Sequence, residues 1–213
     1  MAPGRDARDV ATPTRRTQAV TPDEALAGLL AGNERFASGQ PHYGHDVAAA
    51  AATAGGQQPD AAVVGCIDSR VPLEAVFDQD FGAICVVRSG GTVIDRAVLG
   101  SVEFAVSELA VPLVVVLGHE RCGAIAATIT ALRTGRRPGG GLGYLVDSIA
   151  PAVLEIGLDQ PDLATRALHR HVRRTVFKLR AAAGPVEEGY GSGRVAVVGA
   201  VYDLDTGRVD LLD

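Results

Sequence analysis

The chain has few aromatic residues: it contains no tryptophan, and aromatic side chains make up only 4% of its 213 residues. Its core must therefore be built from Ala, Val, Leu and Ile, and frequent Val is typical of buried parallel strands. Hydrophobic residues account for 47% of the sequence and charged residues for 21%, a balance that excludes a disordered or fibrous chain. The composition predicts an α/β protein.

Long apolar runs and excess positive charge are also missing. The longest strong apolar run, Val111–Gly118, contains a proline and is far shorter than the ~20 residues of a membrane span. No apolar run follows the arginines near the amino terminus, as a signal peptide would require. A net charge of −5 argues against nucleic-acid binding, and the basic stretch 166–180 fits a solvated helix face. We expect a cytoplasmic protein that binds neither nucleic acid nor membrane.

Helix and strand patterns alternate from residue 21 onward. Residues 1–20 show no periodicity and predict a disordered tail, which leaves 21–213 as a single domain. Thr21 is expected to cap the first helix. Further helices are expected over 48–54, 93–109 and 161–182 and from about residue 122, strands over 61–64, 83–87, 112–117 and 195–201, and a flexible break at 139–143. This alternation predicts a mostly parallel β-sheet flanked by helices on both faces.

Cysteine is scarce, and three residues are too few for a disulfide framework in a chain of this size. Cys66 follows one predicted strand, and His119 with Cys122 follows another. Because the carboxyl ends of parallel strands share one edge of a sheet, these side chains are expected to meet there. Alone, each is more often a buried small residue or a chance match. Together they favour a catalytic zinc site with two cysteines, one histidine and an open fourth position.

Asp68 and Arg70 follow Cys66 at intervals of two residues. A forked ion pair with Arg70 would keep Asp68 ionised and aim its carboxylate. Held off the metal, Asp68 would accept a hydrogen bond from zinc-bound water, whereas moved onto the metal it would be a fourth ligand and close the site. The alternative is a surface ion pair of little energetic consequence.

Four segments together resemble the β-class carbonic anhydrases. They are Cys66-Ile67-Asp68-Ser69-Arg70-Val71, Val87-Arg88, Gly118-His119-Glu120-Arg121-Cys122-Gly123-Ala124 and Gly199-Ala200-Val201-Tyr202-Asp203-Leu204, and the similarity covers nearly all of the chain after the tail. The resemblance implies one zinc ion per chain, held by Cys66, His119 and Cys122. It also implies reversible hydration of carbon dioxide to bicarbonate and a proton, by zinc-bound hydroxide that Asp68 and Arg70 orient.

The resemblance further implies an oligomer and a substrate pocket. The first helix is similar to the family's extended N-terminal helical arm, which packs on a neighbouring subunit, so a homodimer or a dimer of dimers is expected. Gln57 stands where many members place a glutamine that binds substrate across the interface, and Gly123 where the backbone contributes to the pocket. Cys85 and Phe104 stand at pocket-wall positions that often hold Phe and Tyr in relatives. We expect a pocket wall of altered shape.

Two other functions fit the same residues. In a non-catalytic zinc protein, Asp68 would fill the fourth position permanently, and the metal would serve folding or bicarbonate sensing. In a hydrolase of the same fold, the site would act on carbon disulfide or a related small electrophile. The segment Ser89-Gly90-Gly91 matches neither the dinucleotide fingerprint nor the phosphate-binding loop, so nucleotide binding is not expected.

Overall fold

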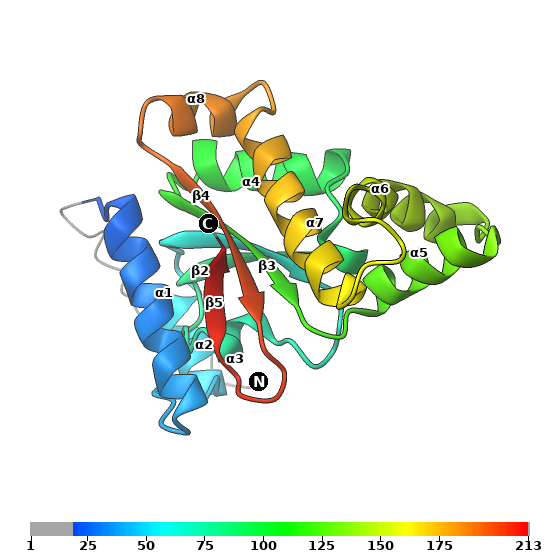
Figure 1. The fold of residues 1–213 in the computed structure, drawn as a ribbon. Coiled ribbons are helices and arrows are strands. Elements are labelled where there is room, and N and C mark those ends of the chain that lie inside the picture. The colour runs from blue at the N-terminus through cyan, green and yellow to red at the C-terminus, as the bar shows by residue number, and fades with distance from the viewer. Residues whose placement is uncertain (1–18, 213) are drawn as a thin grey trace, which may run out of the picture.

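A computed structural model describes residues 19–212, which form a five-stranded sheet with helices on both sides (Figure 1). The strand order is β2-β1-β3-β4-β5, in which the first four strands are parallel and β5 is antiparallel to β4. The strands are β1 Ala61–Cys66, β2 Ile84–Ser89, β3 Leu113–His119, β4 Ala196–Tyr202 and β5 Val209–Leu212. The predicted α/β class and mostly parallel sheet are confirmed.

Helices lie close to the predicted positions at 22–37, 47–53, 96–107, 123–134 and 163–180, whereas those at 73–76, 140–156 and 185–191 were not predicted. They are α1 Pro22–Ala37, α2 Val47–Thr53, α3 Leu73–Val76, α4 Arg96–Ser107, α5 Gly123–Thr134, α6 Gly140–Ile156, α7 Leu163–Arg180 and α8 Pro185–Gly191, with a 3-10 turn, η1, at Gly90–Thr92. Thr21 caps α1 as expected: its side chain accepts a hydrogen bond from the Glu24 amide, and the Glu24 carboxylate accepts one from the Thr21 amide. Asp95 caps α4 in the same manner through the Val98 amide.

Alternate residues of the central strands point to opposite faces of the sheet, and each face has its own core. Ala62 and Val64 of β1 pack with residues of α4, α5, α6 and α7, whereas Ala61 and Val63 pack with residues of α1 and α3. Figure 1 shows α1 on one side of the sheet and α7 on the other. Both faces are therefore covered, which explains why the inner strands are apolar throughout instead of alternating.

Helix α1 packs against its own chain. The Asn33 side-chain amide donates to Val76 O at 3.0 Å and to Gly207 O at 2.8 Å, and Asn33 Oδ1 accepts from the Val209 amide at 2.8 Å. A buried amide that satisfies three backbone groups fixes the helix firmly on the sheet. The packing of this helical arm on a neighbouring subunit stays a prediction.

The predicted flexible break at 139–143 is wrong, because α6 begins at Gly140. Its buried residues Ile149 and Val153 pack in the core beside α5 and α7, so tertiary packing outweighs the low helix propensity of the glycines. The sequence-based prediction also missed β5, a four-residue strand that pairs with β4 after a turn at Gly207. The predicted tail at 1–20 falls outside the described residues except for its last two. Among the described residues, no helix has the length and apolar character needed to cross a membrane.

Candidate metal centre

Cys66, His119 and Cys122 meet at one edge of the sheet. Cys66 ends β1, His119 ends β3 and Cys122 is the residue before α5, and β1 and β3 are parallel neighbours. Their ligand atoms all lie within 4.8 Å of one another. All three residues are buried, with exposed fractions of 5%, 1% and 6%. The structure thus brings together the three residues that the sequence predicted as ligands.

The ring of His119 presents a lone pair to this cluster. Its Nδ1 atom lies 2.9 Å from the carbonyl oxygen of Glu120, and because a carbonyl only accepts, Nδ1 carries the proton. Nε2 is therefore an acceptor, and it is buried without a hydrogen-bond partner. A buried acceptor left unsatisfied is costly. A metal ion bound at Nε2 removes that cost, and the carbonyl fixes the ring orientation as is usual for metal-binding histidines.

The pKa values of the Cys66 and Cys122 thiols are shifted in opposite directions. The pKa of Cys66 is lowered to about 4. The main cause is a hydrogen bond that the Cys122 thiol donates to Cys66, and the Gly91 amide donates a further one, while burial opposes the shift. The pKa of Cys122 is raised by the Cys66 thiolate and by burial. Both thiols ionise together only when a cation neutralises them. Two thiolates and one imidazole are a donor set that suits zinc.

Asp68 lies beside the cluster and is held by Arg70. Arg70 Nε donates to Asp68 Oδ1 at 2.9 Å, its Nη2 donates to Oδ2 at 2.8 Å, and its backbone amide donates to Oδ1 at 3.0 Å. The Arg70 guanidinium keeps the pKa of Asp68 below its usual range. Oδ2 stands 3.9 Å from His119 Nε2. The predicted Asp-Arg pair is therefore present at the edge of the cluster.

Arg88, at the end of β2, fixes the loop that carries these residues. Its Nε donates to the Cys66 carbonyl at 2.8 Å, and its Nη2 donates to the Asp68 carbonyl at 2.5 Å. The sequence placed Arg88 in the family pattern without a role. Its contacts could not be predicted because they depend on the pairing of β1 with β2.

A pocket of about 440 Å³ opens above the cluster. Cys66, Asp68 and Gly123 are among the residues that line it, and the role of Gly123 in substrate binding stays a prediction. Much of the remaining wall is formed by apolar side chains; they are Ala124, Ala127, Pro138, Leu142, Leu145 and Val146. The α6 part of this wall was missed, because the sequence-based prediction placed a flexible break where this helix begins. An apolar pocket against a polar cluster suits a small non-polar substrate.

Comparison with known proteins decides the family. The family model described as carbonic anhydrase matches residues 61–209, more than half of the chain. Carbonic anhydrase 2 of Mycobacterium tuberculosis is 45% identical over 193 residues, which cover 90% of this chain and 93% of that protein. The chain belongs to the carbonic anhydrase family. Carbonic anhydrases are lyases of the carbonate dehydratase type, and this chain is one of them.

Solved structures place this carbonic anhydrase in the β class. The Coccomyxa β-carbonic anhydrase, solved with acetazolamide, has a TM-score of 0.70 and 26% identity, covering 88% of this chain and 86% of that one. A tetrameric β-carbonic anhydrase of Sordaria macrospora has a TM-score of 0.70 and 24% identity, covering 89% and 95% of the two chains. Both structures therefore share the overall fold of this chain.

The other three predicted pocket residues do not line this pocket within one chain of the carbonic anhydrase. Gln57 is exposed and lies beside Gly82. Cys85 is half-buried in β2, and burial raises the pKa of its thiol. Phe104 is 56% exposed on α4. Their roles in substrate binding stay predictions, and the predicted role of Gln57 requires a second subunit.

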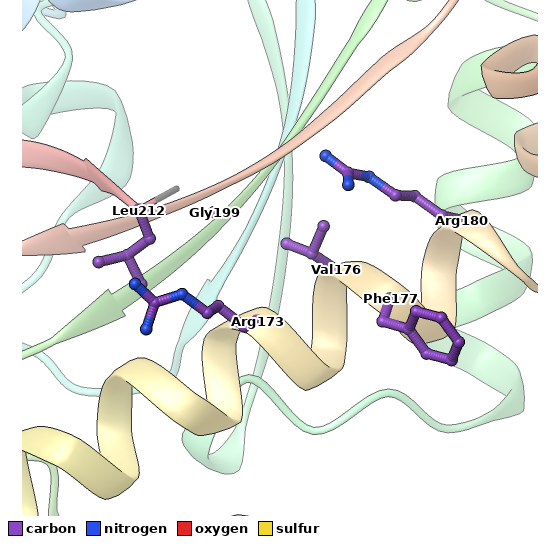
Figure 2. A pocket seen from close by; sticks show the side chains of 6 residues that line it. All are labelled: Arg173, Val176, Phe177, Arg180, Gly199 and Leu212. Atoms are coloured by element: carbon purple, nitrogen blue, oxygen red, sulfur yellow. The ribbon is translucent and has the colours of Figure 1, made fainter.

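A smaller pocket of about 240 Å³ lies between α7 and strands β4 and β5. Figure 2 shows Arg173 and Arg180 reaching from α7 toward the strands, with Val176 between them. The Arg180 guanidinium donates to Val197 O and lies 4.8 Å from the centre of the Tyr190 ring. None of the residues that line this pocket is a carboxylate, cysteine or histidine, so the lining offers no metal ligand.

Proposed function

We propose that this protein catalyses the reversible hydration of carbon dioxide to bicarbonate and a proton with one zinc ion per chain. The observation that carries the proposal is the unpartnered Nε2 of His119, which lies within 4.8 Å of the thiols of Cys66 and Cys122, beside an apolar pocket that Cys66 lines. These three residues would hold the ion. Zinc at such a site supplies a hydroxide nucleophile near neutral pH, because it lowers the pKa of a water molecule that it binds.

In this proposal Asp68 orients the nucleophile. Its Oδ2 accepts one hydrogen bond from Arg70 and keeps acceptor capacity on the side that faces His119. Arg70 stabilises the ionised carboxylate, and the two parallel bonds between the side chains fix its plane. A carboxylate that accepts the nucleophile's hydrogen points a lone pair toward the carbon atom of the substrate.

The apolar wall would receive carbon dioxide. Leu142, Leu145 and Val146 of α6 line the same pocket as Cys66 and Asp68, and their side chains offer the substrate no hydrogen-bond partner. A weakly polar molecule is therefore held near the nucleophile without competition from polar contacts. Bicarbonate, which is charged, is less well accommodated by the same wall, and this difference favours its release.

The hydrogen bonds between Arg70 and Asp68 favour a catalytic function over the function of a non-catalytic zinc protein. A permanent fourth ligand would have to give up both bonds between the side chains and the bond from the Arg70 amide. The open fourth position is the arrangement of catalytic zinc, whereas structural sites fill all four positions with protein atoms.

Assembly into a homodimer or a dimer of dimers is part of the proposal. Gln57 would reach the pocket of the neighbouring subunit, and the exposed Phe104 would face that subunit. The tetrameric state given for the Sordaria macrospora structure supports an oligomer. The free cysteines agree with a reducing compartment, and we propose that the protein acts in the cytoplasm.

The test is stopped-flow hydration of carbon dioxide with a pH indicator, from pH 6.5 to 9, on protein of measured zinc content. We expect one zinc per chain and a rate that rises with pH. Cys66→Ala should lose both the zinc and the activity. Cys85→Ala is the matched control for zinc content, because its thiol lies outside the cluster. One zinc per chain with no hydration at any pH would overturn the proposal.

A further inference from the structure

The turn beside Cys66 contains two consecutive residues in the left-handed region. Gly91 has φ +63° and Thr92 has φ +56°. Glycine adopts this conformation freely, but it is strained for a β-branched residue such as threonine. Strain of this kind persists only where the surrounding structure holds it, and it is concentrated at functional sites.

Gly91 is held on every side. Its amide donates to Cys66 Sγ at 3.4 Å, and its carbonyl oxygen accepts from Thr92 Oγ1 at 2.6 Å and lies 2.8 Å from His171 Nε2. A Cβ atom at residue 91 would approach Ala124 Cβ to 2.8 Å and Ile149 Cδ1 to 2.9 Å. The contacts with α5 and α6 exclude a side chain, and the hydrogen bond to Cys66 requires the amide to stay where it is.

Within the described residues, His171 is the only polar side chain that contacts Gly91 from outside both the turn and the cluster of Cys66, His119 and Cys122. It is 3% exposed on α7 and does not line the pocket. Burial lowers its pKa to about 4, and the positive charges of Lys178 and Arg174 act in the same direction, against the hydrogen bond with Gly91. The ring is therefore neutral near pH 7. Because its partner is a carbonyl, Nε2 carries the proton and donates it.

We propose that His171 is a positioning residue that holds the Gly91–Thr92 turn, so that the Gly91 amide keeps its hydrogen bond to Cys66 Sγ and thereby tunes the metal. The inference rests on the proposed function in that Cys66 is a zinc ligand. A hydrogen bond to a thiolate withdraws charge from sulfur, which leaves the metal a stronger Lewis acid. This matters in a site with two thiolates, because each of them weakens the metal's pull on a bound water.

The experiment compares His171→Leu, which removes the donor at similar size, with His171→Gln, which keeps an N–H group. Val176→Ala is the control, because it truncates a buried residue of the same helix that packs near Gly199, away from the turn. Each protein is loaded with cobalt to record the thiolate-to-metal absorption band, and with zinc to record removal by a chelator. The pH midpoint of hydration is the third measurement.

In His171→Leu the band should move to longer wavelength and the pH midpoint should rise, because Cys66 is then a more basic thiolate. Zinc should be removed about tenfold faster, because the turn no longer fixes the position of Cys66. His171→Gln should stay close to the wild type. Val176→Ala should lower stability without moving the band or the midpoint. A His171→Leu protein with the wild-type band, zinc release and midpoint would overturn the proposal, and so would a Val176→Ala protein that shifts as His171→Leu does.

A measurement on the wild type keeps the proposal falsifiable if His171→Leu does not fold. In protein loaded with a magnetically active cadmium isotope, the Gly91 amide proton should show scalar coupling to the metal through Cys66 Sγ. Absence of this coupling would overturn the inference. The metal spectra need no catalysis, so a protein that binds metal but does not hydrate carbon dioxide would refute the proposed function and leave the role of His171 to be decided separately.

Discussion

Asp68 lies just after strand β1 and Asp78 just after helix α3, and both pair with an arginine, but their surroundings differ. Asp78 is 1% exposed and its carboxylate is saturated: Arg35 Nε donates to it at 2.5 Å, and the amides of His42 and Tyr43 donate at 2.9 to 3.1 Å. Asp68 is 18% exposed, and within residues 19–212 its Oδ2 accepts a hydrogen bond only from Arg70. A saturated, buried carboxylate holds the fold together, whereas one with spare acceptor capacity beside metal ligands is placed for chemistry.

The largest effect is expected for Asp68→Asn. The amide keeps the shape of the side chain but cannot serve as the same ionised acceptor, so hydration should fall by about 100-fold or more. Zinc content and the free energy of unfolding should change little, because Asp68 is outside the buried cluster. Stopped-flow rates, metal analysis and urea unfolding measure the three quantities. Retained activity with full zinc would show that Asp68 is a surface ion pair without a catalytic role.

The opposite pattern is expected for Asp78→Asn. Asparagine tolerates the left-handed conformation of this residue, φ +43°, so the substitution removes mainly the charge. Three hydrogen bonds from donors on α1 and the following loop lose their ionised acceptor. The free energy of unfolding should fall by about 1.5 to 3 kcal/mol, while folded protein keeps its activity per zinc. A loss of activity per zinc at unchanged stability would remove the distinction between the two aspartates.

Acidification should show the contribution of Asp78 directly. The Arg35 guanidinium and the His42 and Tyr43 amides hold the pKa of Asp78 below its ordinary value, against the effect of burial. A lowered folded-state pKa gives stability that is complete above the unfolded value of about 3.9 and is lost as the pH falls through the folded value. The difference in unfolding free energy between wild type and Asp78→Asn should therefore be constant near neutrality and shrink below about pH 4. A difference that grows on acidification would have the wrong sign.

The sequence alone was sufficient to predict where residues at the ends of strands lie in the fold. Cys66 and His119 end two strands with apolar, β-rich sequences, so their meeting could be predicted from the parallel sheet. Asp68 was found because it lies two residues after Cys66 in the chain. His171 was missed because its site contact joins α7 to a turn 80 residues earlier, and on the sequence it is one polar residue in an amphipathic helix. Contacts between distant elements leave no periodic signal.

The turn before β5 did leave a signal. Asp203 accepts hydrogen bonds from the amides of Asp205 and Thr206, and Gly207 adopts φ +73°, a combination typical of a tight turn between two strands. The α6 helix is the opposite case. Its glycine-rich start resembles a loop, and the apolar face that stabilises it becomes evident only when α5 and α7 are in place.

The smallest effect is expected for Arg70→Lys, and it separates orientation from charge. The Arg70–Asp68 pair is exposed on the arginine side, at 51%, so stability should change little. Lysine keeps the positive charge but cannot form the two parallel bonds that fix the carboxylate plane. A loss of about 1.4 kcal/mol in orientation corresponds to about tenfold in rate, and we expect a decrease of this order at full zinc content.

Arg121→Lys is the matched control for that substitution. Arg121 forms an equivalent two-bond pair with Asp205, at 2.7 and 2.8 Å, and both side chains are exposed. The Asp205 carboxylate lies outside the cluster of Cys66, His119 and Cys122, so losing its fixed plane should leave hydration unchanged. Equal losses in the two variants would mean that the geometry of Arg70 has no special part in the reaction. A tenfold loss in Arg70→Lys alone would show that the plane of the Asp68 carboxylate, in addition to its charge, sets the rate.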